Sequence, residues 1–324
     1  MSAALEQIQT PIARELVEFE KHFRTAVSTR VALLDKVMQY ILRRKGKQMR
    51  PMFVFLSAGT VGEIGPESYR AAALIELLHT ATLIHDDVVD DADERRGFFS
   101  LNALWKNKIA VLVGDFLLSR GLLTALEAED FRLLKIVSTA VKMMSEGELL
   151  QMEKARTLNI DEPVYFEIIR HKTASLIAAC CESGAAAAGA SADVVEKMRD
   201  FGENVGMAFQ IKDDLFDYGG ADAGKPVGID LKEKKMTLPL IYVMNQCSWT
   251  ERRKLIQIVK NHNTDKKKVA WLTQFVRERG GIDYSVKTMN EYTDKALKIL
   301  NAFPENPSRK SLKDLVEYTV SRNK

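Results

Sequence analysis

The sequence predicts an all-α protein, organised as a single large helical-bundle domain over residues 1–324. Apolar residues recur every three or four positions through most of the chain, which is the spacing of one helix face. Strand-type alternation is nearly absent, and the 324 residues include only eight prolines, so long stretches contain no helix breaker. No linker long enough to separate two domains interrupts these stretches, and a chain of this length can bury one substantial core.

Composition is that of a globular chain and argues against several functional classes. The net charge of +3 is too small and too evenly spread to predict a nucleic-acid partner. The three cysteines, Cys180, Cys181 and Cys247, lack metal-ligand spacing and fit a reducing compartment. The N-terminus is polar, and no window offers about 18 uninterrupted apolar residues, so we expect neither a signal peptide nor a transmembrane segment. These features favour the cytoplasm.

Several long helices are predicted in the N-terminal half. The region 12–42 has apolar residues at helical spacing and ends in a basic turn punctuated by Gly46. Gly65 and Pro66 mark the start of a helix, and no breaker follows until residue 96, so one helix about 45 Å long is expected there. Further helices are predicted over residues 52–61, 110–128 and 131–155.

The C-terminal half continues the helical pattern around one glycine-rich loop. A helix follows Pro163, and another is predicted over residues 194–218. Four glycines within 219–228 predict a mobile loop that could close over the preceding helix end. The remaining helices are predicted over residues 238–245, 252–261, 269–278, 285–301 and 312–321.

The most informative stretches are two copies of an Asp-Asp-x-x-Asp motif, each after an apolar run. The first comprises Asp86, Asp87 and Asp90, and the second comprises Asp213, Asp214 and Asp217. A single acidic cluster is usually a solvated helix end, but two copies by chance are expected in well under about a hundredth of chains this size. The outer acids of each copy lie four residues apart, on one helix face.

These acids are candidate magnesium ligands. Magnesium prefers oxygen ligands and usually shares them with substrate phosphates, and basic residues near both motifs would complete a diphosphate site. A hydrolase with paired carboxylates needs two acids rather than six. A Walker loop is absent, which disfavours a P-loop nucleotide enzyme. Metal held around a diphosphate would make it a good leaving group.

From about Lys45 onward, the chain resembles the trans-type polyprenyl diphosphate synthases, and within them the long-chain, octaprenyl-like members. The resemblance rests on several motifs in a fixed order: Gly46-Lys47-x-x-Arg50-Pro51, His79-x5-His85-Asp86-Asp87-x-x-Asp90, Arg95-Arg96-Gly97, Gly114-Asp115, Lys172-Thr173, Gln210-x-x-Asp213-Asp214-x-x-Asp217, Gly224-Lys225-x-x-Gly228 and Lys235-x-Thr237-Leu238-Pro239. Two departures are Gln48, where the family usually has arginine, and the bulky segment 98–102.

The resemblance implies a fold of the isoprenoid synthase type, a helical bundle around a deep central cavity, and a role for each matching residue. It implies a catalytic set of Asp86, Asp90, Lys172, Thr173, Gln210 and Asp213. Magnesium, three ions per site, would be held by Asp86, Asp87, Asp90, Asp213, Asp214 and Asp217. The allylic diphosphate would be held by Arg95, Lys172, Lys225 and Lys235, and isopentenyl diphosphate by Lys47, Arg50, His79 and Arg96. Thr173 and Gln210 would line the space around the carbocation.

Product length in the family depends on the depth of the pocket beneath the first motif. The fifth and fourth positions before Asp86 are Ala81 and Thr82, neither of which is an aromatic plug. The resemblance therefore implies a long product, of about C30 to C40, with a floor formed by Leu122, Leu123 or Leu126. Ala81→Tyr is expected to shorten the product.

Other readings of the sequence stay open. A short-chain farnesyl or geranylgeranyl diphosphate synthase would share the motifs. A class I terpene cyclase would not need the residues assigned to isopentenyl diphosphate, and a non-catalytic isoprenoid-binding protein would not need both acidic motifs. The resemblance also implies a homodimer.

Overall fold

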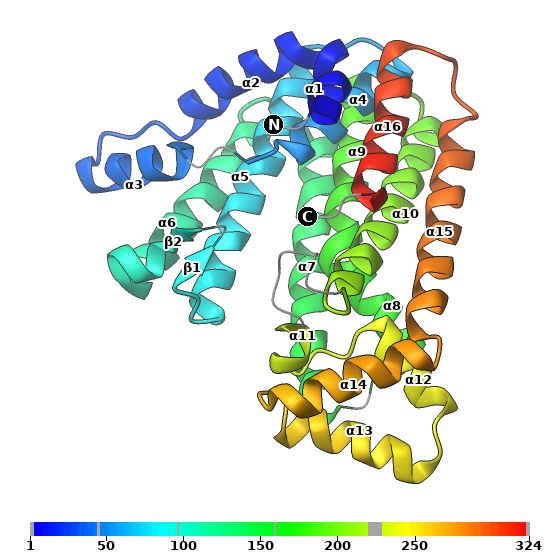
Figure 1. The fold of residues 1–324 in the computed structure, drawn as a ribbon. Coiled ribbons are helices and arrows are strands. Elements are labelled where there is room, and N and C mark those ends of the chain that lie inside the picture. Colours follow the sequence, from blue (N-terminus) through cyan, green and yellow to red (C-terminus); the bar gives the residue numbers. More distant parts are fainter. Residues whose placement is uncertain (1–2, 44–45, 96, 159, 220–228, 322–324) are drawn as a thin grey trace. The chain divides into compact units, whose positions relative to one another are not determined.

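The computed structural model describes residues 3–43, 46–95, 97–158, 160–219 and 229–321, and it is almost entirely helical (Figure 1). The all-α prediction is therefore confirmed. The elements are α1 (Ala3–Gln9), the 3₁₀ turn η1 (Thr10–Ile12), α2 (Ala13–Ala26), α3 (Ala32–Arg43), α4 (Met49–Val61), α5 (Pro66–Val89), β1 (Glu94–Arg95), β2 (Phe98–Phe99), α6 (Leu101–Leu126), α7 (Phe131–Thr157), α8 (Glu162–Ile169), the π turn η2 (Arg170–Ala174), α9 (Ser175–Ala187), α10 (Ala192–Phe216), α11 (Ile229–Lys232), α12 (Leu238–Gln246), α13 (Trp249–Asn261), α14 (Lys266–Glu278), α15 (Gly281–Leu300) and α16 (Pro307–Ser321).

The chain forms two compact units, each assembled from separate segments. Unit 1 contains residues 1–141, 179–199 and 303–312, and unit 2 contains residues 142–178, 200–302 and 313–324. Helices α7 and α10 each contribute to both units. The prediction of one domain around a deep central cavity stays a prediction.

Unit 1 is organised around α5 and α6, which pack side by side (Figure 1). A cluster of buried apolar residues joins them to α3, with Leu77, Ala81 and Leu117 at its centre. Close approach is possible because Gly121 lies against Leu74 and Leu78, where an added Cβ would be 3.1 Å from the first and 3.3 Å from the second. This packing fixes the last turns of α5, which carry the first acidic motif.

The helix predicted over residues 67–96 is shorter than expected. It ends at Val89, and Asp91 takes a left-handed conformation with φ of 48°, which aspartate tolerates better than most residues. Strands β1 and β2 then form a two-stranded antiparallel hairpin. At its end, Ser100 caps α6 by accepting a hydrogen bond from the backbone N–H of Ala103 at 3.3 Å. Helix α6 therefore begins at Leu101, nine residues before the predicted start, and kinks at Lys106.

The first predicted helix is also divided. The backbone leaves the helix after Ala26 and resumes at Ala32, so residues 12–42 become a 3₁₀ turn and two helices. In the intervening loop, the Ser28 hydroxyl donates to the backbone carbonyl of Thr25 at 2.9 Å, and Thr29 Oγ1 accepts from Val31 N at 3.2 Å. Such local side-chain bonds offer the backbone an alternative to the helix, which apolar spacing alone does not reveal.

Unit 2 has its own core, formed where α8, α10, α12, α14 and α15 meet. Its fully buried members include Met207, Ile211, Leu240 and Leu272. Gly206 allows α10 to approach the end of η2, because an added Cβ would lie 2.4 Å from the Cα of Ala174. This contact sets the second acidic motif, later on α10, relative to the Lys172–Thr173 pair.

Within the described residues, α6 is the one helix whose length and composition would let it cross a membrane. The sequence analysis expected no transmembrane segment, because no window of about 18 residues is uninterruptedly apolar; in α6, Asp115 and Arg120 interrupt the apolar run. Both charged residues are engaged within unit 1: Asp115 pairs with His85, and Arg120 Nε donates to the carbonyl of Ala26 at 2.8 Å.

Candidate active site

The first acidic motif occupies the last turn of α5 and the residue after it. Asp86 is half-buried and Asp90 exposed, whereas Asp87 retains only 4% exposure. Asp86 and Asp90 are four residues apart and project from one helix face, while Asp87 is rotated by about 100° toward the interior. The outer acids are thus more accessible to a ligand than Asp87, which the resemblance also implied as a magnesium ligand; the ligand roles of all three stay predictions.

His85 secures this turn against α6. Its Nε2 lies 3.4 Å from Asp115 Oδ1 and 3.3 Å from the carbonyl of Val111. The imidazole fits because Gly114 has no side chain there; an added Cβ would lie 2.2 Å from His85 Nε2. The Gly114-Asp115 motif therefore receives the histidine that precedes the acids.

The basic residues assigned to isopentenyl diphosphate come from α4, α5 and the turn before α4. Arg50 Nε lies 3.1 Å from Glu76 Oε2, so an ion pair joins α4 to α5. Lys47 is exposed and His79 half-buried. Gln48, which replaces the family's usual arginine, adopts a left-handed φ of 52° and donates to Glu20 Oε1 at 3.2 Å. This glutamine holds α2 to the basic turn.

Four further predicted anion-binding residues are only partly covered by the described residues. Arg95 belongs to β1, and Arg96 lies outside the described residues. Lys225 and the glycine-rich loop around it also lie outside them. Lys235 is described: it is half-buried, and its Nζ lies 2.5 Å from Glu233 Oε2. The roles of these four residues stay predictions.

The second acidic motif ends α10, and its acids differ in their surroundings. Asp213 is half-buried, while Asp217 retains 7% exposure and accepts a hydrogen bond at Oδ1 from the backbone N–H of Asp230 at 3.3 Å. That bond ties the end of α10 to the start of α11, which follows the glycine-rich loop.

Asp214 lies within a chain of hydrogen bonds rather than at an open face. Its Oδ2 accepts from the Tyr165 hydroxyl at 2.8 Å, and its Oδ1 accepts from Gln210 Nε2 at 2.9 Å. Gln210 Oε1 in turn accepts from the Thr173 hydroxyl at 2.7 Å. The pKa of Asp214 is raised to about 7, chiefly by burial and also by the neighbouring Asp230, while the hydrogen bonds from Gln210 and Tyr165 oppose the shift. We predicted Asp214 as a metal ligand; both of its oxygens already have protein donors.

The chain of bonds fixes the direction of the polar groups at its end. With Gln210 Nε2 turned toward Asp214, the amide oxygen faces Thr173, and the threonine hydroxyl must donate its proton to that oxygen. The Thr173 oxygen therefore presents lone pairs, not a proton, to whatever lies beside it. This arrangement suits a neighbouring positive charge.

Lys172 lies in the π turn η2, where it faces α7. Its Nζ is 2.5 Å from Glu148 Oε2 and 3.4 Å from Gln151 Oε1. The close approach depends on Gly147, because an added Cβ would lie 2.8 Å from both His171 Cβ and the backbone nitrogen of Lys172. π turns occur frequently at functional sites. The sequence analysis identified Lys172 and Thr173 but gave no sign of this turn.

Tyr165, Glu148 and Gln151 were missed by sequence reasoning. Each lies on a predicted helix at ordinary helical spacing, so nothing in the local pattern distinguishes it from a packing or surface residue. The pair Gly147-Glu148 offered a weak signal, since a glycine inside a helix often marks close approach of another backbone.

The acids of the first motif belong to unit 1, and those of the second motif belong to unit 2. Among the described residues, no three His, Cys, Asp or Glu side chains of the structure are grouped tightly enough to hold a metal ion. The donor set nevertheless suits magnesium, because Asp86, Asp90, Asp213 and Asp217 offer carboxylate oxygens, which hard divalent cations prefer. Coordination by two acids on each helix, completed by substrate oxygens, is compatible with both observations.

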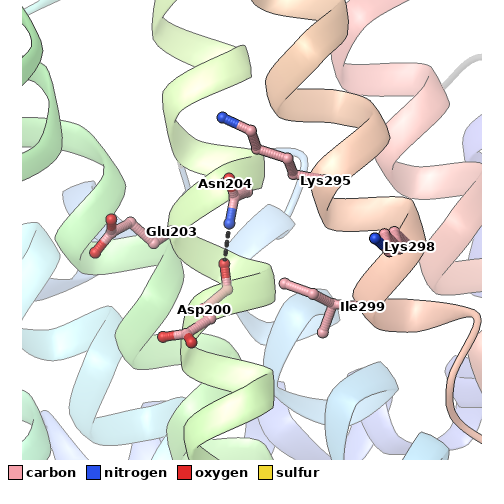
Figure 2. A pocket seen from close by; sticks show the side chains of 6 residues that line it. All are labelled: Asp200, Glu203, Asn204, Lys295, Lys298 and Ile299. Atoms are coloured by element: carbon pink, nitrogen blue, oxygen red, sulfur yellow. Dashed lines mark hydrogen bonds between the residues drawn. The ribbon is translucent and has the colours of Figure 1, made fainter.

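A separate hollow lies on the surface of unit 2, between α10 and α15 (Figure 2). This groove of about 480 Å³ is lined by Asp200, Glu203, Asn204, Lys295, Lys298 and Ile299. None of the residues predicted to bind substrate lines it, and its two lysines face two acids, so the lining carries no net charge. We assign it no function.

Comparison with known proteins identifies the family. The chain matches the Polyprenyl synthetase family over residues 31–276. The chain belongs to this family. The predictions of a trans-type prenyltransferase with an isoprenoid synthase fold are therefore confirmed.

The most informative relatives are long-chain enzymes. The chain is 36% identical over 320 residues to an all-trans-nonaprenyl-diphosphate synthase of Rhodobacter capsulatus, covering 98% of each chain. It is 34% identical over 322 residues to the octaprenyl diphosphate synthase of Escherichia coli, covering 99% of each. Among solved structures, it resembles a polyprenyl synthase from Caulobacter crescentus complexed with calcium and isoprenyl diphosphate, with a TM-score of 0.90, 32% identity, and coverage of 99% of this chain and 98% of that one.

Proposed function

We propose that the protein condenses an allylic prenyl diphosphate with successive molecules of isopentenyl diphosphate, in a magnesium-dependent reaction, to give a polyprenyl diphosphate of about C30 to C40. The observation that carries this proposal is the pair of helix ends that present Asp86 with Asp90 and Asp213 with Asp217. The long-chain relatives support the length of the product.

In this proposal, the chain's residues orient the substrates and stabilise the developing positive charge. Lys172, with Arg95, Lys225 and Lys235, binds the allylic diphosphate. Lys47, Arg50, His79 and Arg96 bind the diphosphate of isopentenyl diphosphate. The lone pairs of Thr173, oriented by Gln210, face the allylic carbon as its C–O bond breaks. The isopentenyl double bond then attacks, and a proton leaves to the departed diphosphate.

Magnesium would be held by the outer acids of each motif, Asp86 and Asp90 on α5 and Asp213 and Asp217 on α10. When bound, it neutralises the charge that develops on the leaving diphosphate. We propose three ions per site. Asp87 and Asp214 hold the two helix ends in place, since Asp87 is buried and Asp214 has two protein donors.

The test is incubation of the purified protein with isopentenyl and farnesyl diphosphates, with and without magnesium. We expect a condensation product that requires the metal and is lost in Asp86→Asn and Asp213→Asn variants. A cyclised hydrocarbon formed from farnesyl diphosphate alone would instead indicate a terpene cyclase. Absence of any product, with isoprenoid binding retained, would indicate a non-catalytic protein.

Product length is proposed to depend on Thr82 and on the α6 residues Leu122 and Leu126, with Leu123 beside them. Thr82 is half-buried, whereas Ala81 is 1% exposed and belongs to the packed cluster of unit 1. Leu122 and Leu126 are 37% and 50% exposed. Gly121 packs beside Leu74 and Leu78 of α5, so the neighbouring Leu122 lies at about the same depth as those two residues. That depth is about 16 Å from Asp86, measured along the axis of α5. Such a floor would leave room for a long tail.

Thr82→Phe is a sharper test of this pocket than Ala81→Tyr. A large ring at the buried Ala81 position would disturb the core as well as the pocket, because overpacking strains a close-packed interior. We expect Thr82→Phe to shorten the product by one or more five-carbon units at unchanged thermal stability. A product distribution identical to that of the unaltered protein would contradict the assignment of Thr82.

We also propose that the protein is a cytoplasmic homodimer. Six large apolar residues of α6 are exposed: Leu104 before the kink at Lys106, and Val111, Leu112, Leu122, Leu123 and Leu126 after it. The five after the kink fall within an arc of about 120° on the helix surface. Exposed Asp115 and Ser119 lie within the same arc, so the face carries two apolar groups separated by polar residues. Exposed apolar groups rimmed by polar residues are typical of a protein interface. A second copy of the chain is its proposed partner, because homo-oligomers with a self-complementary interface are the commonest assemblies.

A further inference from the structure

One surface of unit 2 is strongly basic, although the chain as a whole is nearly neutral. Residues 249–271, which form α13, the following loop and the start of α14, contain seven lysines and arginines and two acids. Their net charge of +5 exceeds the +3 of the entire chain. The even charge distribution expected from the sequence is therefore wrong for this segment, which we call the basic hairpin (Figure 1).

The outer face of α13 combines this charge with apolar side chains. Trp249, Arg253, Ile256 and Lys260 follow the spacing i, i+4, i+7, i+11 and lie within about 60° of one another around the helix. Trp249 is 71% exposed, and Ile256 is half-buried. The opposite face carries Leu255, Ile258 and Val259, all buried in the core of unit 2.

The acid of α13 is turned away from that face. Glu251 lies about 160° from Trp249 around the helix, and its Oε1 pairs with Arg279 at 2.7 Å. Its other oxygen caps the helix by accepting from the backbone N–H of Ser248 at 2.9 Å. The outer face of α13 therefore presents cations and apolar groups without an acid among them.

The start of α14 adds cations at a position that helix stability disfavours. Asp265 caps the helix by accepting from the backbone N–H groups of Lys267 and Lys268, and the first three helical residues are Lys266, Lys267 and Lys268. Cations near a helix N-terminus oppose the helix dipole, so this triplet is not explained by the stability of α14. An anionic partner would relieve the repulsion.

A second tryptophan completes the surface. Trp271 is 39% exposed, and Lys254 Nζ lies 3.6 Å from its ring centroid. Two of the three tryptophans in the chain are thus exposed on the basic hairpin. Tryptophan beside lysine and arginine is typical of helices that lie in the interface of a bilayer, where the ring sits at headgroup level and the cations contact anionic lipids.

We propose that the basic hairpin binds the surface of an anionic lipid bilayer, with the outer face of α13 against the headgroups. Exposed Trp249, with half-buried Ile256 on the same face of α13, favours lipid over nucleic acid, because nucleic-acid binding would not require apolar side chains aligned along the helix. The proposal does not depend on the proposed function. If both hold, the hairpin brings the enzyme to the phase in which a long polyprenyl tail dissolves.

The test is sedimentation of the full-length protein with vesicles of phosphatidylcholine alone or mixed with phosphatidylglycerol. We expect binding to the anionic vesicles, weakening as salt rises, and little binding to the neutral ones. The double variant Arg253→Glu/Lys260→Glu should bind at least about thirtyfold more weakly, because each basic residue near such a surface contributes about 1 kcal/mol. Trp249→Ser should remove much of the blue shift of tryptophan fluorescence on vesicle addition.

Matched controls separate this surface from general charge effects. Lys36→Glu/Lys135→Glu changes the net charge equally at exposed sites on α3 and α7, and should bind like the unaltered protein. Equal loss in both double variants, absence of vesicle binding, or equally strong binding to single-stranded RNA would overturn the proposal. Condensation activity with soluble substrates should persist in the hairpin variants, so a failure of vesicle binding and a failure of the proposed reaction are distinguishable.

Discussion

Tyr165 is the buried end of the hydrogen-bond chain that reaches Thr173 through Asp214 and Gln210. We expect Tyr165→Phe to leave Asp214 Oδ2 without its donor, which costs about 1–3 kcal/mol of unfolding free energy. With Asp214 less constrained, the Gln210 amide can turn and Thr173 can present its proton to the carbocation. The kcat should fall about tenfold, equivalent to ~1.4 kcal/mol in the barrier.

The measurement for Tyr165→Phe is steady-state kinetics together with denaturant unfolding. The KM of both substrates should change by less than about twofold, because Tyr165 contacts neither, and only interactions specific to the transition state alter kcat alone. Tyr292→Phe on α15, whose ring packs against Phe166, is the matched control and should keep its kcat. A kcat equal to that of the unaltered protein would show that the hydrogen-bond chain does not set the orientation of Thr173.

Glu148 offsets the charge of the lysine that we assign to the allylic diphosphate. We expect Glu148→Gln to keep the side-chain shape while leaving the Lys172 charge uncompensated. The KM for the allylic diphosphate should fall by about threefold or more, and its salt dependence should steepen, because screening acts on the additional free charge. The kinetics should be measured across a range of ionic strength.

Glu203→Gln is the control for this effect. It removes a carboxylate that pairs with Arg170 at 3.0 Å on the same π turn, without touching Lys172. If both variants change the KM equally, the effect comes from the general potential of the region rather than from the Lys172–Glu148 pair.

At the scale of elements, the contact of α7 with the π turn rests on one glycine. Gly147→Ala would place a methyl group 2.8 Å from His171 Cβ and from the backbone nitrogen of Lys172. Since one of these atoms is backbone, the two elements must separate. We expect a loss of about 1–3 kcal/mol of unfolding free energy, as for other overpacked sites, and a reduced kcat.

Thermal unfolding and kinetics of Gly147→Ala should be compared with Gly65→Ala at the start of α5. A Cβ at Gly65 would meet only the flexible end of Glu67, at 3.3 Å. Full stability of Gly147→Ala would mean that the contact with the π turn relaxes without consequence.

The sequence predicted elements best where apolar spacing and a breaker agree. Helices α4, α7, α10 and α15 begin and end within a few residues of expectation, because their apolar faces are buried and turns bound them. The predicted end of α5 was wrong because the helix is ended by a backbone conformation that the sequence does not mark. Asp91 accepts a left-handed φ, and no glycine or proline stands at the break. The Ser28–Thr29 break in the first region was missed for a similar reason, since side-chain bonds to nearby backbone end the helix there.

Site residues that belong to a recognisable motif could be predicted from the sequence. Residues whose role depends on a tertiary contact could not. The acids, Lys172 and Gln210 stand out in the sequence. Glu148 and Tyr165 acquire their roles only when α7 meets η2 and when α8 meets α10. Asp214 illustrates both cases, because its motif suggested a metal ligand and its neighbours give it a structural partner on each oxygen.

At the scale of the whole molecule, the proposed homodimer depends on the exposed apolar face of α6. We expect Leu112→Glu to reduce the mass measured by light scattering after gel filtration from two chains to one, because a buried charge without a partner is strongly unfavourable in an interface. Leu112 is 64% exposed in the single chain, so its replacement should leave the fold intact.

Val17→Glu on α2, at 59% exposure, provides the comparison for an apolar residue outside that face. It should leave the mass unchanged. A protein that is monomeric before any substitution, or a Leu112→Glu variant that retains the mass of two chains, would contradict the assignment of α6 as the interface.

The π turn between α8 and α9 also constrains how this stretch of chain can change length. Such a turn accommodates one residue more than an α-helix covers with the same rotation, so the apolar stripes on either side are out of phase by one position. A deletion of one residue within 170–174 could be absorbed as an uninterrupted α-helix, with both flanking faces still buried. It would, however, rotate Lys172 away from its partner Glu148 and Thr173 away from its partner Gln210. A single-residue deletion in this turn should therefore preserve the fold but abolish the activity.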